Sequence, residues 1–324
     1  MLNLFYEEPE PDRWLPFDRF PRRWIRRIVR GAPIVGGQQR VFLNLCAGLD
    51  RIGVAYRVND YRHLTRDPKL LACVVGKPFV LDRLHGNNPI LFGSAVFSHP
   101  VDDPDLLRRL PIRAVLVPGP WCREMFAEFY GEVVHAWPTG IDTDRWQPAS
   151  ASQKKLDFVV YDKIRWERER LVPELVAPLL HTLDRRGLNY RVLRYGGHRL
   201  DDFREALASA RAMLFICEHE TQGFAYQEAL SAGVPVLAWD RGGAWRDPSY
   251  WPDRVTFSPV TSVPYWDERC GVKFTDLGDF GDQLANFLDQ LAAGRFHPRD
   301  FILEHLTLEQ CARDYLRFVE LAQG

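Results

Sequence analysis

Two glutamates in the second half of the chain lie in a segment whose pattern is typical of a ligand site. Glu220 and Glu228 are separated by seven residues within CEHETQGFAYQEALSAGVPVLAWDRGG, which starts at Cys217. The pattern predicts a strand end, a loop, a helix beginning near Gly223, and another strand. Ligands of open parallel sheets bind beyond the carboxyl ends of the strands, and a helix N-terminus attracts phosphate. The segment therefore predicts a site for a phosphorylated ligand.

The length of this helix fits part of a nucleotide sugar. Roughly five residues separate the helix start from Glu228, which is about 8 Å at 1.5 Å per residue. This span is comparable to the reach from a diphosphate to a ribose. We expect a sugar near Glu220, a diphosphate at the amides of Gly223, Phe224 and Ala225, and a ribose at Glu228. Glycine at position 223 lets a ligand come close to the backbone.

Basic side chains follow another predicted strand, in VVYDKIRWERER. Two of them, Lys163 and Arg168, are five residues apart, and a cation of either type can neutralise charge that develops on a phosphate. Arg165 and Arg170 compete for the same role. Glu218 also follows a strand, and we interpret it as incidental.

Further candidates lie in the first half. Gly36 and Gly37 stand before a helix with apolar residues at helical spacing, where paired glycines let a loop approach the donor phosphates or the acceptor. His99 follows the strand-like run NPILFGSAVFS, and histidine can hydrogen-bond sugar hydroxyls or share a proton near neutral pH. His85 is the alternative histidine. The segment from Phe20 to Gly31, FPRRWIRRIVRG, could form a basic amphipathic element for anionic lipid or a lipid-linked acceptor, or a packed loop.

These motifs together resemble glycosyltransferase family 4 and its relatives. The family has Glu-x7-Glu followed by a small-residue stretch ending in Gly-x-Pro-Val, as in EALSAGVPVLA here. Gly223 matches the family's glycine, whereas Thr221 and Gln222 replace the usual Gly-Phe. Lys163 and Arg168 stand for the arginine and lysine that hold the diphosphate. In the WPTGIDTDRW passage between the two halves, Thr139 replaces the usual asparagine.

The resemblance implies the GT-B architecture, in which two Rossmann-like domains face each other across a cleft. It implies transfer of a sugar with retention of anomeric configuration, with the leaving diphosphate helping to deprotonate the acceptor. It also implies His99 facing the donor sugar from the first domain. A nucleotide-diphosphate sugar is then a co-substrate, and no cofactor or metal ion is required. The acceptor would be a glycan, a lipid-linked sugar or a small molecule.

The pattern along the whole chain independently favours an α/β protein. Apolar runs alternate with amphipathic stretches, which is typical of βαβ units. The Pro-, Gly- and Ser-rich passage 137–155 breaks this alternation, so we predict an N-terminal domain over residues 1–150 and a C-terminal, nucleotide-sugar-binding domain over 151–324. We expect irregular structure from Trp239 to about residue 269. The last two helices are predicted near 276–292 and 307–322, and the final one is expected to pack on the first domain.

Composition narrows the classes of partner. The formal net charge is −1, which gives no basic field for nucleic acid. Acidic residues near the N-terminus and the absence of a long apolar run favour a cytoplasmic protein, which could contact the membrane peripherally through residues 20–31. Asp-x-Asp occurs at 103–105 and 142–144, but neither place suits a metal site. A sugar-nucleotide epimerase or phosphorylase, and an inert nucleotide-sugar-binding or glycan-binding protein, remain alternatives.

Overall fold

The structure is a computed structural model that describes residues 1–8, 36–94 and 97–324. The basic segment from Phe20 to Gly31 lies outside the described residues. The first part of the chain forms a six-stranded parallel sheet in the order β2-β1-β3-β4-β5-β6. Its strands are β1 (Leu2–Phe5), β2 (Tyr56–Val58), β3 (Ala72–Val74), β4 (Ile90–Phe92), β5 (Ile112–Val117) and β6 (Val134–Ala136). The helices between them are α2 (Gly37–Arg51), α3 (Tyr61–Arg66), η1 (Pro78–Arg83), η2 (Pro100–Asp102), α4 (Leu106–Arg109), α5 (Pro120–Tyr130) and η3 (Gly131–Val133).

The second part forms a five-stranded parallel sheet in the order β11-β10-β9-β7-β8. Its strands are β7 (Leu156–Lys163), β8 (Tyr190–Arg194), β9 (Ala210–Cys217), β10 (Val236–Trp239) and β11 (Gly271–Phe274). Its helices are η4 (Ala151–Gln153), α6 (Arg168–Leu171), the π-helix η5 (Val172–Val176), α7 (Ala177–Arg185), α8 (Leu200–Ser209), α9 (Phe224–Ser231), α10 (Leu277–Ala292), α11 (Pro298–His305) and α12 (Leu308–Gln323). Parallel strands connected through helices confirm the predicted α/β class.

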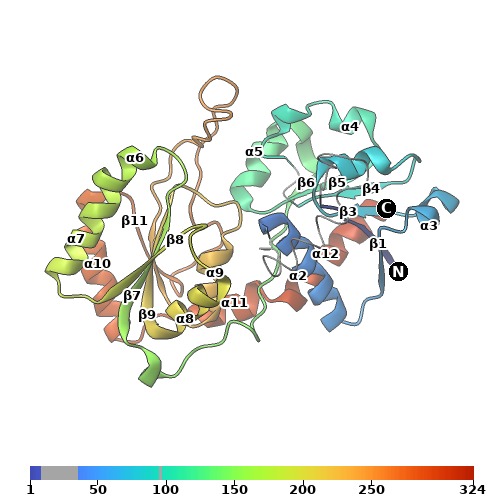
Figure 1. The fold of residues 1–324 in the computed structure, drawn as a ribbon. Coiled ribbons are helices and arrows are strands. Elements are labelled where there is room, and N and C mark those ends of the chain that lie inside the picture. Colours follow the sequence, from blue (N-terminus) through green and yellow to red (C-terminus); the bar gives the residue numbers. More distant parts are fainter. Residues whose placement is uncertain (9–35, 95–96) are drawn as a thin grey trace, which may run out of the picture.

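Alternation along the strands explains how each sheet is covered on both faces. In β9, Met213 and Phe215 face a core with α8, α9 and α11, whereas Leu214 and Ile216 face a core with α7 and α10. The first sheet shows the same division, with α2 on one face and α5 on the other. Figure 1 shows the two α/β units side by side.

The last helix, α12, packs on the first sheet rather than the second. Tyr315 of α12 is fully buried and lies in one core cluster with residues of α2, β3, β4 and β5. A Cβ atom added at Gly48 of α2 would lie 2.4 Å from the Leu308 carbonyl oxygen, so the two helices need glycine at their closest approach. The chain therefore crosses between the units twice, and the two crossings meet where Ile141 N donates to Leu306 O at 2.8 Å.

The irregular segment between β10 and β11 also ties the two units together. It contains no helix or strand, as the sequence predicts. Trp245, Val255, Phe257 and Val260 nevertheless belong to the core cluster of β3, β4, β5 and α5 in the first unit. Their burial explains why a segment without regular structure carries so many aromatic residues.

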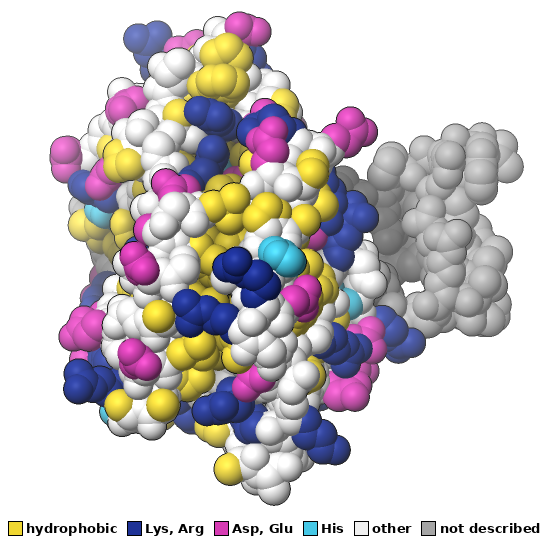
Figure 2. All heavy atoms as spheres, turned by 90° about the vertical axis from the view of Figure 1, so that its left-hand side faces the viewer, with side chains coloured by type: hydrophobic (Ala, Val, Ile, Leu, Met, Phe, Trp, Pro, Cys, Tyr) yellow, Lys and Arg dark blue, Asp and Glu magenta, His cyan; other side chains and the backbone are white. Residues whose placement is uncertain are grey.

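The surface shows no dominant charge on the face that Figure 2 presents. Acidic and basic side chains are interspersed over this face, which is the left-hand side of Figure 1. Within the described ranges, no helix is both long and apolar enough to cross a membrane.

Candidate functional site

The ends of β7 and β9 meet at the switch point of the second sheet. The sheet order places β8 and β9 on opposite sides of β7, so the crossover connections leave a crevice between the carboxyl ends of β7 and β9. Lys163, the last residue of β7, is in register with Cys217, the last residue of β9. The loop at 218–223 therefore begins beside Lys163, where an open α/β sheet places its ligand.

Lys163 and Glu220 form a buried ion pair in this crevice. The lysine Nζ contacts Glu220 Oε1, and the two side chains are 14% and 10% exposed. The Lys163 Nζ also lies 4.6 Å from the centre of the Tyr195 ring. Burial alone would lower the pKa of Lys163, but the carboxylate of Glu220 raises it above its ordinary value. Lys163 therefore carries a positive charge at neutral pH, beside a predicted sugar-binding carboxylate.

The backbone of Glu220 is fixed from both units. Its N–H donates to the Thr261 carbonyl oxygen at 3.0 Å, and its carbonyl oxygen accepts from Trp121 Nε1 of α5 at 2.7 Å. A Cβ atom added at Gly119 would lie 2.2 Å from the Thr221 carbonyl oxygen. The first unit therefore packs directly on the loop that holds Glu220.

The start of α9 has the geometry expected of a phosphate site. Gly223 precedes the helix with φ at 89°, a backbone conformation that favours glycine, and no side chain caps the helix. A Cβ atom at this position would also collide with the Tyr226 ring, at 2.1 Å. The first amides of a helix have no partner within it, and they attract anions. The amides of Phe224 and Ala225 lie in this first turn and are available to a ligand.

Glu228 is paired with an arginine that comes from the other unit. Arg40 of α2 contacts Glu228 through Nη2, and the two side chains are 26% and 2% exposed. The Arg40 Cζ lies 4.7 Å from the centre of the Phe224 ring. Burial, followed by the charge of Arg145, lowers the pKa of Arg40 to about 10, so the side chain remains cationic at neutral pH. Glu228, which the sequence predicts to bind the ribose, thus forms an ion pair with a residue of the other unit.

Gly36 and Gly37 lie at the start of the same helix as Arg40. Gly36 is the N-cap of α2, Gly37 is its first residue, and no side chain caps the helix. A Cβ atom added at either glycine would have nothing within 4 Å among the described residues. As far as the described residues go, the start of α2 therefore has room beside it, one turn before the arginine that reaches Glu228.

Arg168 is committed to an intramolecular partner. Its guanidinium forms a two-point pair with Asp162, including a 2.9 Å bond from Nη1 to Oδ1, and this pairing raises the pKa of Arg168. Glu218, which the sequence led us to treat as incidental, is 3% exposed. Its Oε1 accepts the backbone N–H groups of Arg165 at 2.8 Å and Trp166 at 2.9 Å. Glu218 therefore shapes the loop that follows Lys163.

His99 lies in an aromatic cluster. It is 2% exposed and stacks on Trp245, with ring centres 5.8 Å apart. Its Nδ1 accepts the backbone N–H of Val101 at 3.0 Å, and burial lowers the pKa of His99 to about 4. Phe129 and Tyr250 also contact the ring, so the structure groups His99 with these aromatic residues. Within the described residues, the ring and hydrogen-bond partners of His99 include no other predicted site residue. The alternative, His85, is exposed.

The aspartates of both Asp-x-Asp sequences pair with arginines in the structure. Asp142 and Asp144 both pair with Arg51, at 2.6 and 3.2 Å. Asp103 pairs with Arg109 and Asp105 with Arg108. Among the residues that the structure describes, no group of three or more metal-ligating side chains is suitably placed.

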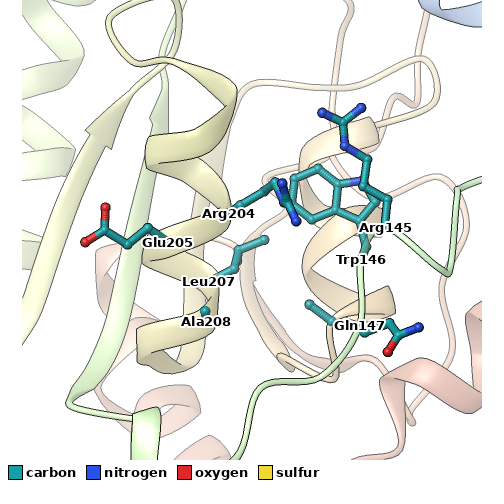
Figure 3. A pocket seen from close by; sticks show the side chains of 8 residues that line it. Arg145, Trp146, Gln147, Arg204, Glu205, Leu207 and Ala208 are labelled. Carbon is teal, nitrogen blue, oxygen red and sulfur yellow. The ribbon is translucent and has the colours of Figure 1, made fainter.

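A separate pocket of about 260 Å³ lies at the other end of α9. Figure 3 shows its lining, in which Trp146 and its neighbours in the crossover face the end of α8. The lining residues are Arg145, Trp146, Gln147, Arg204, Glu205, Leu207, Ala208 and Ala232. Ala232 follows the last turn of α9, whereas Gly223 precedes its first turn. The pocket is therefore distinct from the crevice that contains Glu220.

Three solved structures resemble the whole chain. One is AviGT4, a glycosyltransferase involved in avilamycin A biosynthesis, with a TM-score of 0.58, 15% identity, and coverage of 99% of this chain and 98% of that one. Another is sucrose-phosphate synthase from Thermosynechococcus elongatus, with a TM-score of 0.58, 12% identity and 98% coverage of both chains. The third is HepE from Anabaena in complex with UDP, with a TM-score of 0.58, 10% identity, and coverage of 99% of this chain and 100% of that one.

The chain has the GT-B fold. Its agreement with these structures over nearly the full length confirms the architecture that the sequence predicts. No protein-family model matches the sequence. No curated protein matches it either.

Three residues of the site are not among those singled out from the sequence for ligand contacts. Arg40 pairs with Glu228, Trp121 holds the Glu220 backbone, and Gln222 bonds to the crossover at Thr139. The sequence signal for Gln222 is that it departs from the family's pattern, as Thr139 does. Arg40 stands one turn after the paired glycines, which could have drawn attention to it.

Proposed function

We propose that the chain is a retaining, metal-independent glycosyltransferase that uses a nucleotide-diphosphate sugar. The acceptor is a glycan, a lipid-linked sugar or a small molecule. The observation that carries this proposal is the Lys163–Glu220 pair, which lies at the switch point of the second sheet and beside the uncapped start of α9. The GT-B glycosyltransferases with the same fold support it.

The donor would lie along α9. The sugar hydroxyls bind Glu220, the diphosphate binds the amides of Phe224 and Ala225, and the ribose hydroxyls bind Glu228. The ribose must compete with Arg40 for the Glu228 carboxylate, because the two already form an ion pair. Donor binding is therefore coupled to the contact between the units.

Lys163 would provide most of the electrostatic stabilisation. When the bond between the sugar and the diphosphate breaks, negative charge develops on the leaving oxygen, and a nearby ammonium group stabilises it. That oxygen then takes the proton of the acceptor hydroxyl, while the hydroxyl oxygen bonds to the sugar on the same face. Arg168 adds positive charge behind Lys163, where Asp162 holds it in place. His99 contributes by positioning the aromatic cluster at the contact between the units.

The start of α2 would complete the donor site from the other side. Gly36 and Gly37 leave open space there, so the first amides of α2 can approach the phosphates or the acceptor. Contact of the segment 20–31 with a membrane surface, and a cytoplasmic location, remain predictions from the sequence.

The test compares donor binding and transfer in the full chain. UDP-, GDP- and ADP-sugars are screened by thermal shift, and the donor that binds is incubated with and without candidate acceptors for product analysis. Glu228→Ala should weaken donor binding, whereas Lys163→Ala should lower turnover about 100-fold or more with a smaller change in binding. Glu205→Ala, on the exposed side of α8, is the matched control. Unchanged kinetics in both site variants, or an epimerised donor as the only product, would contradict the proposal.

A further inference from the structure

Three arginines near the Glu220 loop form no ion pair with a carboxylate of the described residues. Arg165 follows β7, and Arg241 and Arg246 follow β10; together we call them the arginine cluster. In the described part of the chain, none of the three forms an ion pair. They contact backbone carbonyls and rings, and the carboxylates of Glu167 and Glu218 act on Arg241 only at longer range. The two cations assigned to the donor each pair with an acidic side chain. The cluster therefore has charge to offer a ligand.

The sheet order places the arginine cluster on both sides of the Glu220 loop. Strand β9 lies between β7 and β10, so Arg165 and Arg241, which follow these two strands, flank the loop on opposite sides. Arg246 follows Trp245, whose ring centre lies 6.4 Å from that of His219. Arg165 Nη2 lies 3.3 Å from the carbonyl oxygen of His219, the residue next to Glu220. Burial lowers the pKa of His219, and the charges of Arg165 and Arg241 lower it further. Both arginines thus act on the same point of the loop.

Arg241 shows the clearest sign of a missing ligand. Its Nη2 has a single weak contact, 3.5 Å from the Ala244 carbonyl oxygen. Its Nε is buried and has no hydrogen-bond partner. Burial and the nearby charge of Arg246 lower the pKa of Arg241. A buried donor without an acceptor is unfavourable, and an anion bound at this position would satisfy it.

The arginine cluster lies at the sugar end of the proposed donor site. In the proposed function, Glu228 binds the ribose of the donor, the start of α9 after Gly223 binds the diphosphate, and Glu220 binds the sugar. His219 is the neighbour of Glu220 on the side away from Gly223. The segment that carries Arg241 and Arg246 also packs on the first unit through Trp245. The cluster is therefore adjacent to His219, the residue before Glu220, and its segment at 241–246 reaches the contact between the units.

We propose that Arg165, Arg241 and Arg246 bind an anionic group, a phosphate or a carboxylate, on the acceptor. This inference rests on the proposed function, because it uses the position that the proposed function gives to the donor sugar. A guanidinium group suits both anions, since its planar N–H donors match two oxygens at once. The Arg165 Cζ lies 4.5 Å from the centre of the Trp166 ring, and this stacking holds the guanidinium in position. The acceptor is accordingly an acidic or phosphorylated sugar.

The experiment uses the full chain saturated with whichever of UDP, GDP and ADP binds most tightly. Glucose 6-phosphate, glucuronate and glucose are then titrated by calorimetry. We expect at least one of the two anions to bind about tenfold or more tightly than glucose, because a hydrogen bond to a charged group is worth that factor. Arg241→Gln and the exposed Arg246→Gln should each remove most of this preference and leave nucleotide affinity unchanged. Arg185→Gln, on the exposed face of α7, is the control.

Two results would overturn the inference. One is that neither anion binds more tightly than glucose. The other is that nucleotide affinity falls in Arg241→Gln as much as anion affinity, which would assign the arginine cluster to the donor diphosphate. If no nucleotide binds, the proposed function fails by itself, and the same titration of the free chain then tests the cluster. If the free chain binds an anion and Arg246→Gln abolishes this binding, the arginine cluster is an anion site. If the free chain binds no anion, the inference is refuted.

Discussion

The ion pair between Arg40 and Glu228 should stabilise the contact between the two units. Glu228 is 2% exposed, so Arg40→Gln leaves a buried carboxylate without its counter-charge. Losing one partner of a buried pair costs about 3–5 kcal/mol, and because Arg40 is a quarter exposed we expect the lower end, about 3 kcal/mol. For a chain of 324 residues this corresponds to a fall of about 4 °C in Tm.

The control for this prediction is Arg51→Gln, on the same helix. Arg51 also pairs with carboxylates across the crossover, but Asp142, Asp144 and Glu309 are all exposed by about a third or more. Exposed pairs contribute about 0–1 kcal/mol. Chemical unfolding of both variants should therefore separate them by about 2 kcal/mol. Equal losses in the two variants would refute the idea that burial of Glu228 decides the effect.

A double variant tests the pair itself. In Arg40→Gln combined with Glu228→Gln, no charge is left without a partner. The loss of stability should therefore be smaller than the sum of the two single losses, by about 1–3 kcal/mol. Additive losses would show that the two side chains contribute to stability independently.

Three further predictions concern packing, hydrogen bonding and pH. Gly48→Ala should destabilise the chain by about 1–3 kcal/mol, because the added Cβ would lie 2.4 Å from Leu308 O. The control, Gly281→Ala, has nothing within 4 Å of its Cβ and should not destabilise the chain. Equal effects of the two substitutions in urea unfolding would contradict this. Gln222→Leu should cost about 2–4 kcal/mol in the same assay, since it leaves two buried backbone groups of Thr139 unpaired; a loss below about 0.5 kcal/mol would count against it. Burial lowers the pKa of His99 to about 4 in the folded chain, so the unfolded state binds more protons between about pH 6.5 and 4. The free energy of unfolding should therefore decrease as the pH falls through this window, by at most about 3 kcal/mol. In His99→Asn, which keeps a side-chain acceptor for the η2 cap, this part of the pH dependence should disappear; an unchanged profile would refute the assignment.

Local pattern was sufficient for most of the fold. The helix predicted after Gly36 and Gly37 is α2, and the last two predicted helices correspond to α10 and α12. Helix α11 was not predicted. It is short and has apolar residues such as Phe301 and Ile302 buried against α9 and its neighbours, so tertiary contacts support it more than periodicity does.

The contacts of the site were harder to predict, because they join residues that are distant in the chain. The Glu-x7-Glu pattern correctly predicted that Glu220 lies in the loop after a strand and Glu228 in the helix that follows, whereas their roles in binding a donor stay predictions. No local pattern shows that Arg40, from α2, reaches Glu228, or that Glu218 binds the loop after Lys163. Both contacts depend on how two parallel sheets are placed against each other, and each single segment is compatible with several placements.

The two departures from the family's pattern illustrate what the three-dimensional contact adds. Gln222 and Thr139 are 4% and 1% exposed, and each differs from the residue that the family usually has. In the structure the Gln222 carboxamide accepts from Thr139 N at 3.1 Å and donates to Thr139 O. The amide of Gln222 thus pairs with the crossover peptide as a neighbouring strand would, which a phenylalanine could not do. The two departures are consequently one feature: the loop that carries Glu220 is bonded to the crossover between the units, so a shift of the crossover must move this loop.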